Sequence, residues 1–148
     1  MVSILIVAHA PLASALQAIA SHAYTECSGE VMAVDVQPSA GLEAAEAQIT
    51  AALAAMPATE VLILSDAFGA TPCNAALNVA DGLRARVVAG VNVPMLWRSL
   101  CYARLPLTEL VERAVDGGRK GILQVASPRR QDQPNCPLSH DSDQDPDQ

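Results

Sequence analysis

A histidine and an aspartate each follow a short apolar run of this chain, in positions where both side chains could act on one substrate. Residues 2–8 form one apolar run, and His9 comes directly after it. Residues 61–65 form a second run, and Asp66 comes directly after that one. An imidazole is a nucleophile for group transfer, and a carboxylate on one ring nitrogen fixes the tautomer and leaves the other nitrogen free to attack. The pair therefore suits a phosphoryl group that is accepted on His9 and released again.

A glycine turn and the start of a helix follow Asp66. Gly69 and Ala70 form the turn, Thr71 is predicted to be the N-cap, and Pro72 the first helical residue. The backbone N–H groups and the dipole at a helix N-terminus favour bound anions. We therefore expect the turn formed by Gly69, Ala70 and Thr71 to hold the phosphoryl group.

Each of these residues also has a purely structural interpretation. A histidine can end a strand without doing chemistry, and an aspartate after a strand is a common turn former. The Thr71 hydroxyl can serve as a cap alone, and Gly69 can serve the turn alone. Their convergence favours chemistry: if the sheet order begins 2-1-3, His9 and Asp66 lie on neighbouring strands about 4.8 Å apart, at the edge where α/β sheets bind ligands.

Other residues with chemical potential are given structural roles. His22 ends a predicted helix, where a cation favours the dipole, and is expected on the surface. Cys73 lies at a helix start, but no base or resolving partner is visible beside it, so packing is favoured. Residues 95–97, which include the only tryptophan, are expected to be core or interface anchors.

Short β-branched runs alternate with alanine-rich helical periods from residue 1 to about residue 125. Strands are predicted at 2–8, 31–36, 61–65 and 86–89. Helices are predicted at 11–22, 39–56 with Ser39 as N-cap, 72–81, 94–103, and 108–116 with a stop at Gly117-Gly118. Residues 121–125 are a possible final strand. Continuous apolar strands are typical of parallel sheets covered on both faces, so we predict one α/β domain with an open doubly wound, mostly parallel sheet and helices on both faces.

Composition narrows the classes of function. The formal net charge is −7 and the pI about 4.7, which disfavours nucleic acid and anionic membrane surfaces as partners. No segment approaches the roughly 20 apolar residues of a membrane span, and no signal peptide is visible. The four cysteines show no metal-type spacing, so we expect a cytoplasmic protein with neither a metal site nor a cofactor.

Residues 126–148 differ from the rest of the chain. They contain four of the ten prolines, two arginines and five aspartates, and almost no large apolar residues. Such a segment buries too little apolar surface to offset its ordering entropy. We therefore expect a domain over residues 1–125 and a disordered, acidic, Pro-rich tail over residues 126–148.

Three motifs give the chain a resemblance to the mannose-type IIA component of the bacterial phosphoenolpyruvate-dependent sugar phosphotransferase system. The motifs are the strand-end His9, residues 66–76, which read Asp-x-x-Gly-x-Thr-Pro-x-Asn-Ala-Ala, and residues 89–96, which read Ala-Gly-Val-Asn-Val-Pro-Met-Leu. The resemblance covers residues 2–125. Ala10-Pro11 stands where a glycine is common after the histidine, and Ala70 replaces the second glycine of a pair; both changes keep small residues near the site.

The resemblance implies a function for the pair and the turn. His9 would be phosphorylated by the phosphocarrier protein HPr, Asp66 would orient His9, and Thr71 would take the place of a serine beside the phosphoryl group. The C-terminal strand of each subunit would be exchanged into its partner, giving a homodimer. Because residues 126–148 are too few for a IIB domain, the acceptor would be a separate IIB protein, or absent. Phe68, the only phenylalanine, lies on the turn and is expected to contact HPr.

Other functions fit the same fold. A regulatory protein would use the phosphorylation state of His9 as a signal without serving a transporter, and the sequence does not separate it from the transport role. A nucleotide or flavin binder is disfavoured because residues 8–11 carry no glycine fingerprint and aromatic residues make up only 3% of the chain. The phosphotransferase subunit of a dihydroxyacetone kinase also begins with a strand-end histidine, but the motifs at 69–74 and 90–96 fit the mannose type better.

Overall fold

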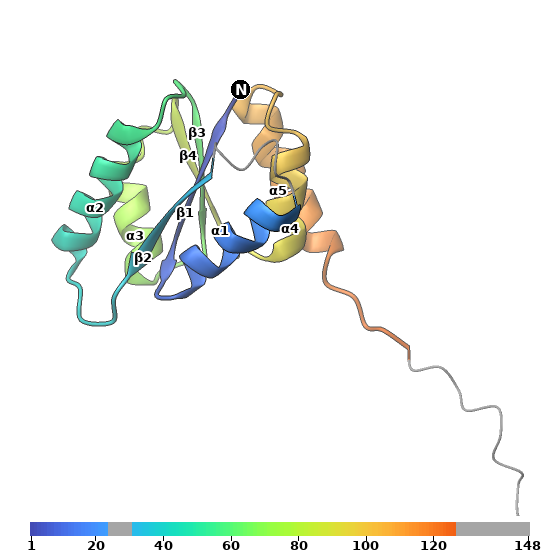
Figure 1. Ribbon diagram of the computed structural model, residues 1–148, viewed down its shortest axis with the longest axis horizontal. Helices are drawn as coiled ribbons and strands as arrows, with labels where there is room; N and C mark the ends of the chain where they lie inside the picture. The colour runs from blue at the N-terminus through green and yellow to red at the C-terminus, as the bar shows by residue number, and fades with distance from the viewer. Residues whose placement is uncertain (24–30, 127–148) are drawn as a thin grey trace, which may run out of the picture.

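The protein is an α/β domain built on four parallel strands (Figure 1). The computed structural model describes residues 1–23 and 31–126. The strands lie in the order β2-β1-β3-β4, so β1 and β3 are neighbours, which is the order on which the expected proximity of His9 and Asp66 depends. Their bounds are β1 Ser3–His9, β2 Val31–Val36, β3 Val61–Ser65 and β4 Ala85–Ala89.

Helices cover both faces of the sheet (Figure 1). Their bounds are α1 Leu12–Ala23, α2 Leu42–Ala55, α3 Thr71–Val79, α4 Val93–Cys101 and α5 Leu107–Lys120. Side chains alternate along β1: Ile4 and Ile6 face the core formed with α1, α4 and α5, whereas Leu5 and Val7 face the core formed with α2 and α3. All four are fully buried, so β1 runs through the middle of the domain and delivers His9 to the carboxyl edge of the sheet.

Two predicted helix starts are wrong by one or more residues. Helix α2 begins at Leu42 with Gly41 as its N-cap, not at Ser39, because residues 37–40 form a turn closed by the Ala40 N–H and the Gln37 carbonyl. Helix α3 has Ala70 as its N-cap, because the Ala70 carbonyl accepts the first helical hydrogen bond, from Asn74 N at 2.9 Å. Thr71 is therefore the first residue of the helix rather than its cap.

The predicted stop of the last helix at Gly117-Gly118 is also wrong. Helix α5 continues to Lys120 because both glycines lie where α5 crosses α4. A Cβ at Gly117 would lie 2.6 Å from Arg98 Cβ, and one at Gly118 would lie 2.7 Å from Met95 Cε. Here the glycines permit close approach of two helices instead of ending one.

The possible final strand over residues 121–125 is not formed in the single chain. Residues 121–126 lie beyond α5 without regular structure, and Ile122, Leu123 and Val125 are all more than three-quarters exposed. The sheet formed by the described residues has four strands, and residues 121–125 are not among them. The predicted tail lies outside the described residues from 127 onward.

Candidate functional site

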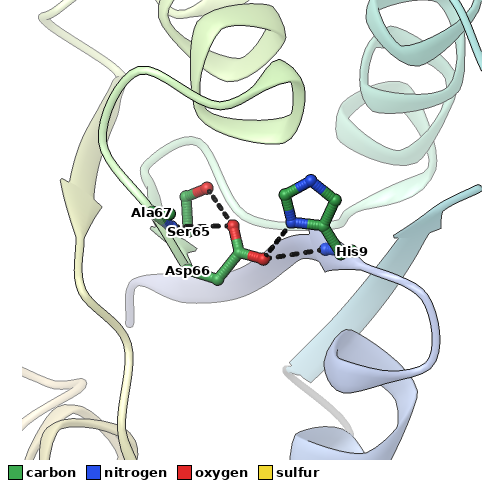
Figure 2. A network of polar contacts seen from close by, with 4 residues as sticks. All are labelled: His9, Ser65, Asp66 and Ala67. Atoms are coloured by element: carbon green, nitrogen blue, oxygen red, sulfur yellow. Dashed lines mark hydrogen bonds and ion pairs between the residues drawn. The ribbon is translucent and has the colours of Figure 1, made fainter. Parts of the chain in front are cut away.

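The ends of β1 and β3 bring His9 and Asp66 into direct contact (Figure 2). His9 Nδ1 lies 2.7 Å from Asp66 Oδ2, and the backbone N–H of His9 donates to the same oxygen at 2.9 Å. The two contacts come from opposite ends of one residue, so they fix both the His9 backbone and its ring. The predicted pairing of the two side chains is confirmed.

The carboxylate of Asp66 is held in its ionised form. Partial burial on its own raises the pKa of Asp66, but hydrogen bonds from the His9 backbone and side chain and from Ala67 N outweigh it, and the pKa lies below its ordinary value. A lowered pKa means that the ionised carboxylate stabilises the folded protein above about pH 4, and that this contribution is lost as pH falls through the lowered value. At neutral pH, Asp66 therefore faces His9 as a full negative charge.

The geometry leaves the other ring nitrogen of His9 exposed. The His9 side chain is 49% exposed, whereas that of Asp66 is 13% exposed. Nδ1 points to the carboxylate, and within the described part of the chain Nε2 makes no hydrogen bond. With Nδ1 protonated toward Asp66, the lone pair on Nε2 faces outward, which is the arrangement that a nucleophilic imidazole needs.

The loop after His9 is anchored to β2. Ala10 N donates to the Val36 carbonyl at 3.0 Å, and Ser14 N in the first turn of α1 donates to Asp35 Oδ1 at 3.1 Å. Asp35 thus caps α1 from a neighbouring strand and fixes the helix that follows the histidine. The sequence does not predict this role of Asp35, since nothing local to residue 35 indicates a cap on residues 12–14.

A turn over residues 67–70 connects Asp66 to α3. Gly69 has a φ of 86°, a left-handed conformation that favours glycine, and its carbonyl accepts a hydrogen bond from Asn74 Nδ2 at 3.1 Å. The backbone N–H groups of Gly69, Thr71 and Cys73 donate no hydrogen bond to any described residue. The turn therefore presents donors at a helix N-terminus, where an anion is favoured.

Thr71 and Phe68 lie on this same turn and helix start. The Thr71 hydroxyl makes no hydrogen bond in the part of the chain that the structure describes, so capping does not occupy it. Phe68 is 83% exposed, so the only phenylalanine of the chain is not part of the core.

Ser65, to which the sequence gives no pointer, lies beside the carboxylate of Asp66. Ser65 is fully buried at the end of β3, and its hydroxyl is 3.5 Å from Asp66 Oδ1, which also accepts Ala67 N at 2.8 Å (Figure 2). Both carboxylate oxygens of Asp66 are therefore engaged. A serine at the end of an apolar strand gives no signal of this contact in the sequence.

The other residues considered in the sequence take structural places. His22 lies exposed in the last turn of α1, and Cys73 is buried in α3. Met95 and Leu96 are buried in α4, whereas Trp97 is 43% exposed. Within residues 1–23 and 31–126, no group of three or more histidine, cysteine or acidic side chains is placed to hold a metal ion, and no helix is both long and apolar enough to cross a membrane.

Fold and site define a parallel α/β domain with a histidine–carboxylate pair at the carboxyl edge of its sheet and a helix N-terminus beside the pair. The family model for EIIA-man, described as the PTS system fructose IIA component, matches residues 3–115. The chain belongs to this family, the IIA components of the sugar phosphotransferase system (PTS), which supports a phosphocarrier role and confirms the resemblance found in the sequence.

Known relatives agree with this membership. The chain is 39% identical over 94 residues to the "PTS system mannose-specific EIIAB component" of Escherichia coli K12, a match that covers 60% of this chain and 29% of that protein. The chain therefore matches less than a third of that relative's length. Its fold is similar to that of the mannose/sorbose-specific IIA subunit of Enterococcus faecalis, with a TM-score of 0.75 at 23% identity, covering 86% of this chain and 96% of the other.

Two further solved structures share the fold. Phosphotransferase system component EIIA from Streptococcus agalactiae has a TM-score of 0.75 at 19% identity, and the match covers 84% of this chain and 97% of the streptococcal chain. A sigma-54 interaction domain protein from Enterococcus faecalis has a TM-score of 0.68 at 11% identity, and the match covers 81% of this chain and 92% of the other chain. At these identities the likeness shows the fold alone.

Proposed function

We infer that this protein is a cytoplasmic phosphoryl carrier that accepts a phosphoryl group from HPr on His9 and passes it to a IIB protein during sugar uptake. The observation that carries the proposal is the 2.7 Å contact between His9 Nδ1 and Asp66 Oδ2, which leaves Nε2 exposed at the carboxyl edge of the sheet. Family membership supports the same role.

Apart from the phosphohistidine of the donor, the transfer needs only groups that the chain supplies. The lone pair of His9 Nε2 attacks the phosphorus of the donor phosphohistidine, the new N–P bond forms, and the donor's N–P bond breaks with its electron pair staying on the donor ring. The imidazole of His9 becomes cationic as this happens, and the negative charge of Asp66 stabilises it. The open N–H groups of Gly69 and Thr71, with the Thr71 hydroxyl, hold the phosphoryl oxygens.

Reconstituted phosphotransfer tests this function. Phosphoenolpyruvate, enzyme I and HPr should label the protein, and addition of a IIB protein should remove the label. A control reaction without HPr should leave the protein unlabelled. Absence of labelling with active HPr would contradict the proposal.

A regulatory role with the same chemistry is the second candidate. In that case His9 is labelled by HPr, but the label is not passed to any IIB protein of the same cell. The fold does not separate the two roles, because it is shared both by PTS IIA proteins and by a protein named for sigma-54 interaction. Transfer from labelled protein to IIB separates them.

Replacement of Phe68 by alanine should weaken the productive encounter with HPr. Phe68 is 83% exposed on the turn that follows Asp66, so a docking protein that reaches His9 meets its ring. An exposed aromatic side chain at an interface centre is worth about 1–2 kcal/mol, or roughly tenfold in the apparent second-order rate of transfer. The measurement is the transfer rate from phosphorylated HPr at limiting HPr.

Leu83 provides the matched control for this variant. It is 77% exposed but precedes β4, at the opposite edge of the sheet from His9. Leu83→Ala should transfer at the wild-type rate. Equal rates for Phe68→Ala and wild type would show that Phe68 is not part of the docking surface.

We also propose that the protein is a homodimer in which residues 121–125 add to the partner's sheet. Strand β4 is an edge strand, and Ile122, Leu123 and Val125 are exposed beyond α5. An open edge and an unpaired apolar segment are complementary. Truncation after Lys120 should therefore give monomer or aggregate in sedimentation, whereas deletion of residues 126–148 should preserve both the dimer and phosphotransfer. A monomeric full chain would contradict the exchange.

A further inference from the structure

A shallow groove between α4 and α5 lies outside the site at His9. Its volume is about 330 Å³, and its walls include Pro94, Trp97 and Arg98 from one side and Lys120 and Gly121 from the other. The indole of Trp97 is 43% exposed there. Within the described part of the chain, Lys120 pairs only with Asp116 on its own helix, at 3.0 Å, and Arg98 has no carboxylate partner. The groove thus combines an aromatic face with a basic rim.

Charge is distributed very unevenly along the chain. Residues 1–83 contain no lysine or arginine and eight acidic residues, whereas residues 84–125 contain seven basic and three acidic residues. The groove between α4 and α5 belongs to this basic part. Of these basic residues, Arg98 and Lys120 line the groove, so a protein with a net charge of −7 has two cationic side chains there that can pair with anionic groups.

The segment that follows the described residues has the complementary chemistry. Residues 127–148 contain four prolines, two arginines and five aspartates, and four of the aspartates fall within residues 141–147. Pro134 and Pro137 have the P-x-x-P spacing of segments that dock on aromatic grooves. Proline rings pack on an indole face, and carboxylates pair with lysine and arginine.

The chain has the length to reach the groove. In the exchanged dimer proposed above, residues 121–125 lie along the partner's sheet, so the free segment begins after Val125. Pro134 lies nine residues beyond Val125, a span of up to about 30 Å when extended. The groove follows α4 from Pro94 to Cys101, a rise of only about 11 Å. A tethered segment has an effective concentration in the millimolar range, so a weak contact is enough to populate the docked state.

We propose that the acidic, Pro-rich segment 127–148 docks on the groove between α4 and α5, with its prolines against Trp97 and its aspartates against Lys120 and Arg98. The segment then covers the exposed indole and pairs with the two cationic side chains of the groove. This contact is independent of the phosphoryl chemistry at His9.

Trp97 reports on this contact because it is the only tryptophan of the chain. Acrylamide quenching of its fluorescence should roughly double when the chain is cut after Ala126, since a docked segment covers one face of the indole. Sodium chloride at about 0.5 M should raise the quenching of the full chain toward that of the truncated chain, because it screens the ion pairs. A synthetic peptide of residues 127–148, added to the truncated protein, should lower the quenching again.

Charge reversal at one lining residue supplies the matched test. Lys120 is exposed at the end of α5, so Lys120→Glu should fold normally and raise quenching in the full chain. Arg104→Glu, an exposed residue outside the groove lining, should leave it unchanged. Equal quenching of the full and truncated chains would overturn the proposal. So would protection of Trp97 that persists in the truncated chain and increases with protein concentration, because a second copy of the protein would then occupy the groove.

Discussion

Asp66→Asn should slow phosphotransfer by two or more orders of magnitude, at least about 2.7 kcal/mol in barrier, while leaving the fold intact. Oδ2 of Asp66 accepts the His9 backbone N–H, and Oδ1 accepts the Ala67 N–H. An asparagine has only one oxygen, so its amide group must face one of these two fixed donors. The His9 ring also loses the negative charge that fixes its tautomer, and the equivalent change in a catalytic triad has a large effect.

The same exchange at Asp81 is a matched control. Asp81 also has a lowered pKa, chiefly because its carboxylate accepts backbone hydrogen bonds from Ala85, Leu83 and Arg84. It lies before β4, at the opposite edge of the sheet from His9. Asp81→Asn should alter stability but not the single-turnover rate of phosphotransfer. A phosphotransfer rate of Asp66→Asn within about threefold of wild type, a barrier change under about 0.7 kcal/mol, would show that Asp66 serves only the turn.

His9→Ala should abolish labelling from phosphorylated HPr altogether. The change removes a ring that is about half exposed and keeps the backbone N–H that donates to Asp66, so little burial is lost and the protein should remain folded. We expect the free energy of unfolding to change by no more than about 1 kcal/mol. Labelling with radioactive phosphoenolpyruvate through enzyme I and HPr measures the first effect, and denaturant unfolding measures the second.

His22 is the internal comparison for this result. It is exposed at the end of α1, and His22→Ala should be labelled like the wild type. Full labelling of His9→Ala, or label recovered on His22, would show that His9 is not the acceptor.

The sequence predicts the core of this site because strand ends are encoded locally. Two continuous apolar runs end at His9 and Asp66, and the parallel topology puts the ends of adjacent strands at one edge. The pairing of β1 with β3 then follows from the strand order 2-1-3. The proximity of the pair thus follows from the sequence once the strand order is given, whereas the chemistry of the pair stays a prediction.

The errors come from contacts between distant parts of the chain. Gly117 and Gly118 look like a helix stop until α4 is packed against them, and the cap that Asp35 provides to α1 joins residues 21 positions apart. Thr71 was predicted to cap α3, but the Ala70 carbonyl makes the first helical bond. Helix caps and crossings depend on the three-dimensional path of the backbone, which short sequence patterns do not specify.

The phosphorus NMR spectrum of the phosphorylated wild-type protein tests the central claim most directly, since it distinguishes the two ring nitrogens of a phosphohistidine. Mass spectrometry of the same sample assigns the modified residue. Because Asp66 occupies Nδ1 of His9 at 2.7 Å, the account predicts a single phosphohistidine, at His9, with the phosphorus on Nε2. Phosphorus on Nδ1 of His9, or on any other residue, would contradict it.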